Sequence, residues 1–323
     1  MRQLCRLLCL ASIPASIATA QISLGGPVAG FVADTRIGAV RPLLGIPGAS
    51  RLGGPLPLPF TVTRAAFASS APAAVAISDD GKVYLLRHLD TIPEAIPQAT
   101  LSGPDAVFIN ADGSLALVYS SSNAALQFLG AAGGVPAAYE PMWGIEGRLL
   151  GAAVEPGSGC AWIARAATAG DSSRVDRICA GRPGEITPAP AGADLAISAI
   201  SSLPRDGGAL VTDRASGRVL LFTWLSGTVE VREIAGSSQG VAGPVAARLL
   251  ASGELLIANR EGREVLVADS GSGEVLRRVP LPGAAAFLDA LGNSALLCSA
   301  PGSPLVLIDL LRQDQAFLVP EEN

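Results

Sequence analysis

The sequence contains few of the side chains with which proteins bind metals and activate nucleophiles. Histidine occurs once, as His88, in 323 residues, so a metal or catalytic site built on several histidines is excluded. Aromatic residues make up only 4% of the chain and the formal net charge is −5. An acidic balance argues against a nucleic-acid partner, which would require a basic face.

Long apolar runs and uninterrupted helical windows are also lacking. Past the N-terminal region no segment reaches the roughly 18 apolar residues of a membrane-spanning helix, so we expect a soluble product without an integral membrane segment. The 37 glycines and 24 prolines interrupt nearly every helix-length window, and short apolar runs lie between them. This pattern predicts an all-β fold of many strands joined by many turns.

Residues 1–20 have the pattern of a secretory signal peptide. Arg2 and Arg6 precede a short apolar stretch, and Ala18-Thr19-Ala20 predicts cleavage before Gln21. A buried first strand is the alternative. Cleavage would leave 303 of the 323 residues, remove Cys5 and Cys9, and shift the net charge from −5 to −7. We therefore expect a secreted or periplasmic protein.

One strand pattern recurs along the chain at intervals of about 44 residues, the length of a four-stranded propeller blade. Each copy is a short apolar strand that ends in a small or polar residue, and the end residues are separated by 53, 33, 45, 48, 46 and 40. The copies are Gly30–Asp34, Val83–Arg87, Ala116–Ser120, Ala161–Arg165, Ala209–Asp213, Leu255–Asn259 and Ala295–Ser299.

The register within each copy indicates a hairpin. Six residues after the strand end, an apolar residue opens another strand in five of the seven copies, at Val40, Leu126, Val219, Val265 and Leu305. Upstream strands end in Asp-Gly turns, as at Gly81, Gly113 and Gly207, because glycine readily adopts positive φ. The pattern predicts seven blades of four antiparallel strands in a single domain over residues 21–323. We expect the stretch after Gln21 to complete the final blade; a solenoid or two sandwiches are the alternatives.

The repeat resembles those of NHL and YVTN-type β-propellers. Leu255–Asp269, Leu-Leu-Ile-Ala-Asn-Arg-Glu-Gly-Arg-Glu-Val-Leu-Val-Ala-Asp, is the segment most similar to them. The likeness extends over nearly the whole chain after residue 20, but only at the level of the repeat. These families include lactonases, lyases and binding modules, so the resemblance implies a fold without choosing an activity.

Cys160 and Cys179 lie on two predicted strands joined by a loop at residues 167–172. Pairing these strands matches residue 166 with 173, and therefore places Cys160 opposite Cys179 within disulfide range. Export would supply the oxidising compartment. We expect a disulfide here, with two buried thiols as the alternative, while Cys298 has the context of a small core residue.

The residues that could form a catalytic site lack the further residues that catalysis would require. Gly236-Ser-Ser-Gln-Gly240 matches a nucleophile elbow, but no histidine follows it in the chain, and His88 has the setting of a solvated loop residue. Propeller lactonases place several calcium-binding carboxylates around their channel. Here only Asp105 brings a carboxylate to a predicted channel mouth, too few for calcium. We therefore predict no catalytic residues, no metal and no cofactor.

Arginines gather at two neighbouring hairpin tips of the predicted propeller. Arg214 and Arg218 flank one tip, and Arg260 and Arg263 lie on the next. Guanidinium groups suit carboxylates, so these residues could bind a partner at one rim, although ordinary solvated loop tips would look the same. Trp143 and Trp224 could add aromatic anchors or pack in the core.

Three functions remain compatible with the sequence. The leading hypothesis is a non-enzymatic, exported propeller that binds a protein or small-molecule ligand through one rim. The second is a lactonase-type hydrolase with Asp105 in its channel, and the third is a self-assembling structural protein of the envelope.

Overall fold

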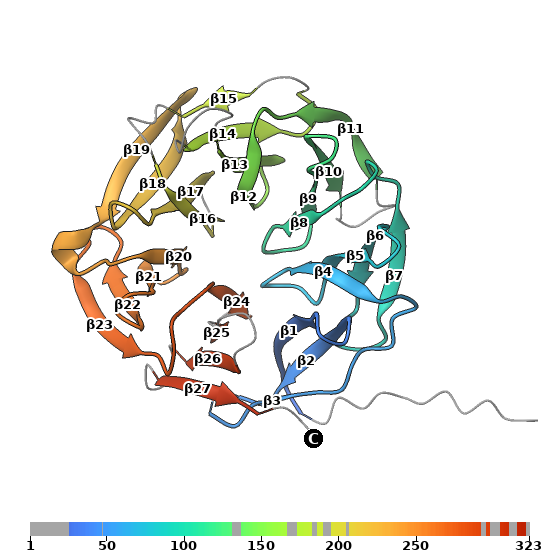
Figure 1. The fold of residues 1–323 in the computed structure, drawn as a ribbon, viewed down its shortest axis with the longest axis horizontal. Coiled ribbons are helices and arrows are strands. Elements are labelled where there is room, and N and C mark those ends of the chain that lie inside the picture. The colour runs from blue at the N-terminus through green and yellow to red at the C-terminus, as the bar shows by residue number, and fades with distance from the viewer. Residues whose placement is uncertain are drawn as a thin grey trace, which may run out of the picture.

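The chain folds as a β-propeller in which antiparallel sheets surround a central axis (Figure 1). The computed structural model describes residues 26–46, 48–130, 137–166, 173–182, 186–189, 195–204, 207–291, 295–297, 304–309 and 315–320. Residues 1–20 and Cys298 lie outside this part of the chain. No helix in the described part has the length and apolar character needed to cross a membrane.

Six sheets have four strands each, in sequence order from the axis outwards. They are β4–β7 (Val62–Phe67, Ala74–Ser78, Val83–Arg87, Glu94–Gln98), β8–β11 (Ala106–Ile109, Leu115–Ser120, Ala125–Gly130, Ala137–Gly144), β12–β15 (Arg148–Val154, Cys160–Ala166, Ser173–Cys179, Thr187–Pro188), β16–β19 (Ile197–Ser202, Gly208–Asp213, Arg218–Leu225, Thr228–Ala235), β20–β23 (Pro244–Leu249, Glu254–Asn259, Glu264–Asp269, Val275–Pro280) and β24–β27 (Asp289–Leu291, Ala295–Leu297, Leu305–Asp309, Gln315–Val319).

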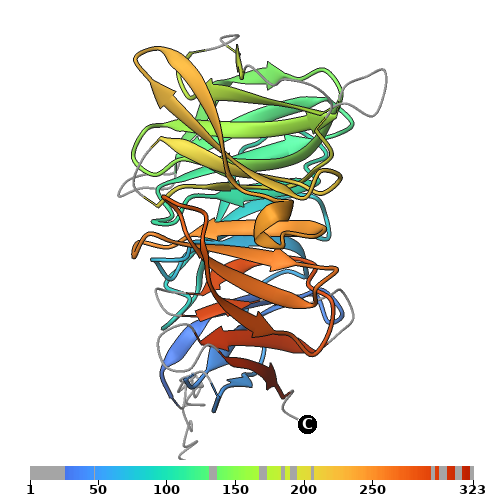
Figure 2. The same cartoon turned by 90° about the vertical axis from the view of Figure 1, so that its left-hand side faces the viewer.

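Within the described residues the first sheet has three strands, β1 (Val28–Asp34), β2 (Ala39–Leu44) and β3 (Arg51–Leu52). The prediction of seven four-stranded blades is therefore wrong, because six sheets have four strands. The predicted closure is also wrong, since the last sheet draws all four strands from residues 289–319. Leu52 donates a backbone hydrogen bond to the carbonyl of Pro320, which brings the first sheet beside β27 (Figures 1 and 2).

The loop after β1 shows which strand the first sheet lacks. Gly38, at φ 63°, accepts a 2.7 Å backbone hydrogen bond from Val62, the first residue of the next inner strand. Gly217 occupies the same place between the second and third strands of its sheet, with φ 65°. It also lies against the segment that leads into the next sheet. By this equivalence β1 is a second strand, and the described residues contain no inner strand beside it.

The predicted repeat register is confirmed in most sheets and wrong in one. The copies ending at Asp34, Ser120, Arg165, Asp213 and Asn259 are second strands, and so is the described part of the one ending at Ser299, which lies in β25 (Ala295–Leu297). Val83–Arg87 instead forms β6, a third strand, and the true second strand ends at residue 78, 44 residues after 34 and 42 before 120. The error arose because the turn at Gly81 joins second and third strands, whereas the similar turn at Gly113 joins first and second.

Apolar second and third strands build the core between neighbouring sheets. Every residue of β5, β9 and β17 is buried, because inner and outer strands and adjacent sheets cover them. Trp143 is 2% exposed and contacts Phe128 edge-on at 5.1 Å between ring centroids. Trp143 is therefore a core residue, which was the second of the two interpretations that the sequence allowed.

Asp34 ties β1 to β2 through an ion pair with Arg41 at 3.2 Å, while Arg36 binds the same carboxylate from the loop. The hydrogen bond from Arg36 is the main cause that holds the pKa of Asp34 below its ordinary value, and Arg41 adds to it against the opposing effect of burial. A carboxylate with a lowered folded-state pKa stabilises the fold above its unfolded pKa, and this contribution disappears as the pH falls toward the folded value.

We therefore expect Asp34→Asn to reduce stability at neutral pH. The stability of the variant should also depend less steeply on pH as the solution is acidified. The urea midpoint of the natural sequence should fall more steeply between about pH 5 and pH 3 than that of the variant. Parallel slopes for the two proteins would show that Asp34 does not contribute to acid sensitivity.

Candidate functional site

A cavity of about 500 Å³ lies on the axis, lined by residues from all seven sheets. Its lining residues belong to the six inner strands and their adjoining loops, to β1 in the first sheet, and to β26 at Leu305. Four of the eight phenylalanines of this aromatic-poor chain line it, namely Phe31, Phe67, Phe108 and Phe287. The lining is therefore mixed, because Ser69, Ser201, Ser202, Arg248 and Asp289 add polar groups to its aromatic and aliphatic residues.

Arg248 and Asp289 are the only charged residues among those lining the cavity, and they neutralise each other. The guanidinium of Arg248 contacts the Asp289 carboxylate at 2.9 Å and donates a second bond to the carbonyl of Leu288 at 3.0 Å. In the described part of the chain, no three His, Cys, Asp or Glu residues gather as a metal-binding group. The lining thus combines apolar contact surface with a few polar groups, and its two charged side chains are paired with each other.

Asp105 directly precedes the inner strand β8, as the sequence suggests, but it does not line the described cavity. It borders a separate open hollow together with Thr35, Thr63 and Arg64. Its carboxylate accepts hydrogen bonds from the backbone and hydroxyl of Ser121. These bonds fix the loop after β9 and give Asp105 a local structural role.

The other motifs have ordinary loop geometry. His88 is exposed after β6 with φ 53°, a left-handed conformation that turns the chain toward β7. Ser237–Gln239 form a single 3₁₀ turn, and the Gln239 side chain accepts a 2.9 Å hydrogen bond from the Gly236 backbone. A nucleophile elbow requires a strand, a sharp turn and an α-helix, whereas β19 leads here into a single 3₁₀ turn.

The four rim arginines lie on two adjacent sheets, where Arg214, Arg260 and Arg263 are in loops that join second and third strands and Arg218 is the first residue of β18. Arg214, Arg260 and Arg263 are exposed, and no described residue forms an ion pair or side-chain hydrogen bond with them. Arg218 differs, because its guanidinium contacts the buried Asp213 carboxylate at 3.1 Å and bonds to Ser216. Arg218 therefore has a structural role, whereas the other three arginines have no partner among the described residues.

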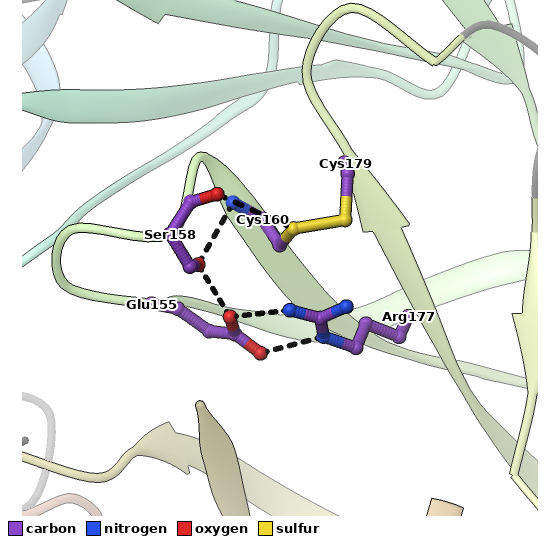
Figure 3. Close-up of a disulfide and its surroundings, with 5 residues drawn as sticks. All are labelled: Glu155, Ser158, Cys160, Arg177 and Cys179. Carbon is purple, nitrogen blue, oxygen red and sulfur yellow. Dashed lines mark hydrogen bonds and ion pairs between the residues drawn. A yellow bond between two sulfur atoms is a disulfide. The ribbon is translucent and has the colours of Figure 1, made fainter. Parts of the chain in front are cut away.

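The disulfide joins Cys160 of β13 to Cys179 of β14, as the strand register predicts (Figure 3). The two cysteines face each other in the ladder, and Ala166 faces Ser173. Cys160 is 6% exposed, and Cys179 is partly buried. It closes a hairpin with an unusually long connecting loop.

A buried ion pair, which sequence analysis missed, lies beside this disulfide. Both carboxylate oxygens of Glu155 accept 2.8 Å bonds from the guanidinium of Arg177, and Ser158 also donates to the carboxylate (Figure 3). The guanidinium lies 4.9 Å from the ring centroid of Trp224 and 5.9 Å from that of Trp162. Trp224 therefore packs over the internal guanidinium of Arg177. No sequence pattern connects these residues, because they come from different strands and sheets.

Comparison with solved structures finds the same fold in proteins of different function. The chain matches hydrazine synthase of Kuenenia stuttgartiensis at TM-score 0.62 and 10% identity, over 88% of this chain and 92% of that one. A streptogramin B lyase structure matches at 0.55 and 16%, over 83% and 86%, and YCF48 of Cyanidioschyzon merolae at 0.54 and 14%, over 84% and 93%. No protein-family model and no curated protein sequence matches the chain. These likenesses establish the propeller fold alone.

Proposed function

We propose that this chain is an exported, non-enzymatic β-propeller that binds an acidic partner through the rim formed by the loops at 214–217 and 260–263. The observation that carries the proposal is the set of three exposed guanidinium groups, those of Arg214, Arg260 and Arg263, without a partner in the described structure. Each offers several donors in a planar fork that matches a carboxylate. The supporting aliphatic stems lie on rigid hairpins of adjacent sheets.

Export and a single domain over residues 21–323 belong to this proposal. The basic and apolar leader before Ala20 and the Cys160–Cys179 disulfide both favour an oxidising compartment. A related fold supports a binding role, because the structure of YCF48 bound to D1 peptide matches this chain at TM-score 0.52 and 12% identity, over 84% of this chain and 89% of that one.

The lactonase alternative has little support from the site. Asp105 is held by Ser121 outside the described cavity, and the cavity's one carboxylate, that of Asp289, is neutralised by Arg248. A hard cation would require six to eight oxygen ligands. The binding proposal therefore explains more of the observed geometry.

If the rim binds acidic partners, replacing its arginines should specifically lower the affinity for anionic peptides. We expect Arg260→Gln combined with Arg263→Gln to weaken binding of a fluorescent oligo-glutamate peptide at least about tenfold at low salt, since charge-assisted hydrogen bonds contribute about 1.5–3 kcal/mol each. Fluorescence anisotropy titration measures the change. Arg214→Gln should weaken binding further, because its loop lies beside the other.

Arg232→Gln is the matched control, because Arg232 is exposed on the outer strand β19, away from both loops. It should bind the peptide as the natural sequence does. Equal weakening by Arg232→Gln would mean that the peptide responds to net charge alone, which would contradict a rim site.

A further inference from the structure

Among the described residues, no strand pairs with the inner edge of β1, which faces the axial cavity. Val40 and Pro42 of β2 direct their carbonyls outwards, where they accept bonds from Leu56 and Gly53, both at 2.8 Å. In an antiparallel ladder the backbone direction alternates, so Val32 and Asp34 bond to β2. The backbone groups of Phe31 and Ala33 then point away from β2, toward the cavity that both residues line.

Burial also distinguishes β1 from its counterparts in other sheets. The second strands β5, β9 and β17 are buried along their whole length, whereas four of the seven residues of β1 are half-exposed. Such partial exposure is typical of the inner strands here, for example β16. The first sheet therefore has room for one more strand, on the side where the other six sheets carry theirs.

Chain order identifies the segment that fits this position. In each of the six four-stranded sheets, the inner strand directly precedes the second strand, across a connection of three residues (292–294) to six residues (68–73). β1 begins at Val28, so a three-residue connection at Gly25-Gly26-Pro27 places the end of an inner strand at Leu24. Glycine and proline in that connection are typical of a tight turn.

Residues 21–24, Gln-Ile-Ser-Leu, have the composition that the cavity requires. In an extended segment Ile22 and Leu24 share one face, as apolar residues against the phenylalanine-lined wall would. Four residues equal the length of the inner strand β8 and exceed the three of β24. The segment carries no charged side chain, which suits a wall whose two charges are already paired.

We propose that residues 21–24 add to the open edge of β1 as the inner strand of the first sheet, so that removal of the leader completes the propeller. The new strand would bond to the backbone of Phe31 and Ala33 and cover the aromatic wall beside them. The inference depends on the proposed export in one respect, because cleavage after Ala20 decides where the strand begins.

Native-state hydrogen exchange tests this proposal on the protein that begins at Gln21. The amides of Phe31 and Ala33 should exchange at least about tenfold faster in a variant that begins at Gly25, because the bonds of the added strand are lost. Ile22→Pro in the longer protein should have the same effect, since proline cannot donate to the ladder. Val32 and Asp34 serve as internal reference amides, and removal of residues 321–323 is the matched truncation.

Equal exchange at Phe31 and Ala33 in the long and short proteins would overturn the proposal. Slow exchange that appears only after an apolar peptide is added to the long protein would also overturn it, and would assign the edge to a partner. Intact mass reports leader cleavage separately. Cleavage without protection refutes the strand and leaves export standing, while protection in a protein whose leader is retained refutes export and keeps the strand.

Discussion

Replacing Glu155 with alanine is expected to lower the free energy of unfolding by about 3–5 kcal/mol, because it leaves the buried guanidinium of Arg177 without its carboxylate partner. The side chain of Glu155 is 0% exposed and that of Arg177 is 11% exposed, so water cannot replace the missing carboxylate. Trp224 and Trp162 add cation–π attraction but accept no hydrogen bond from the nitrogens that Glu155 now satisfies. The penalty therefore comes from an uncompensated charge more than from the strength of the pair.

Urea denaturation of purified Glu155→Ala measures this loss, with Asp289→Ala as the control. Asp289 also pairs with an arginine, but its side chain is 57% exposed, so its removal should cost about 0–1 kcal/mol. A double variant, Glu155→Leu with Arg177→Met, should recover much of the stability lost by Glu155→Ala, because it removes both charges. Comparable losses for Glu155→Ala and Asp289→Ala would contradict the buried-charge account.

Removing the disulfide through Cys160→Ala and Cys179→Ala is expected to cost about 3 kcal/mol, or about 5 °C in Tm for a chain of this length. The two cysteines are 19 residues apart in sequence, so the bond restricts a substantial loop in the unfolded chain. Because it also ties the ends of β13 and β14, we expect the loss to appear as faster unfolding of the sheet that contains Glu155.

Thermal unfolding with and without a thiol reductant separates the effect of the disulfide on Tm from the effect of the two substitutions. Reductant should lower the Tm of the natural sequence toward that of the double alanine variant, and should leave the variant unchanged. An oxidised natural protein with the same Tm as the reduced one would show that the disulfide does not stabilise the fold.

Local spacing explains why the disulfide and most of the hairpins could be predicted. A two-residue alternation and a turn of known length determine which residues face each other, and these features placed Cys160 opposite Cys179. The same reasoning located the third strands beginning near Val219 and Val265. It failed at Val83–Arg87 because second and third strands carry the same apolar pattern, and only pairing with inner or outer neighbours distinguishes them.

The functional candidates depended on contacts that local patterns do not encode. The sequence identified four rim arginines, but only the structure shows that Arg218 pairs with Asp213 while Arg214, Arg260 and Arg263 have no described partner. Glu155 meets Arg177 because three strands bring them together, and neither residue belongs to a recognisable motif. Four phenylalanines from different sheets likewise converge only when the ring closes.

The sequence by itself determined that this chain is an all-β propeller with four-stranded units and one cross-strand disulfide. Those properties follow from turn chemistry and alternation within some 20 residues, which tertiary contacts reinforce without having to create them. Only the tertiary structure showed which sheet has no described inner strand, which arginines have no described partner, and that four phenylalanines line the axial cavity. These features arise where segments distant in sequence meet, since closure of the ring determines which edges and charges find partners.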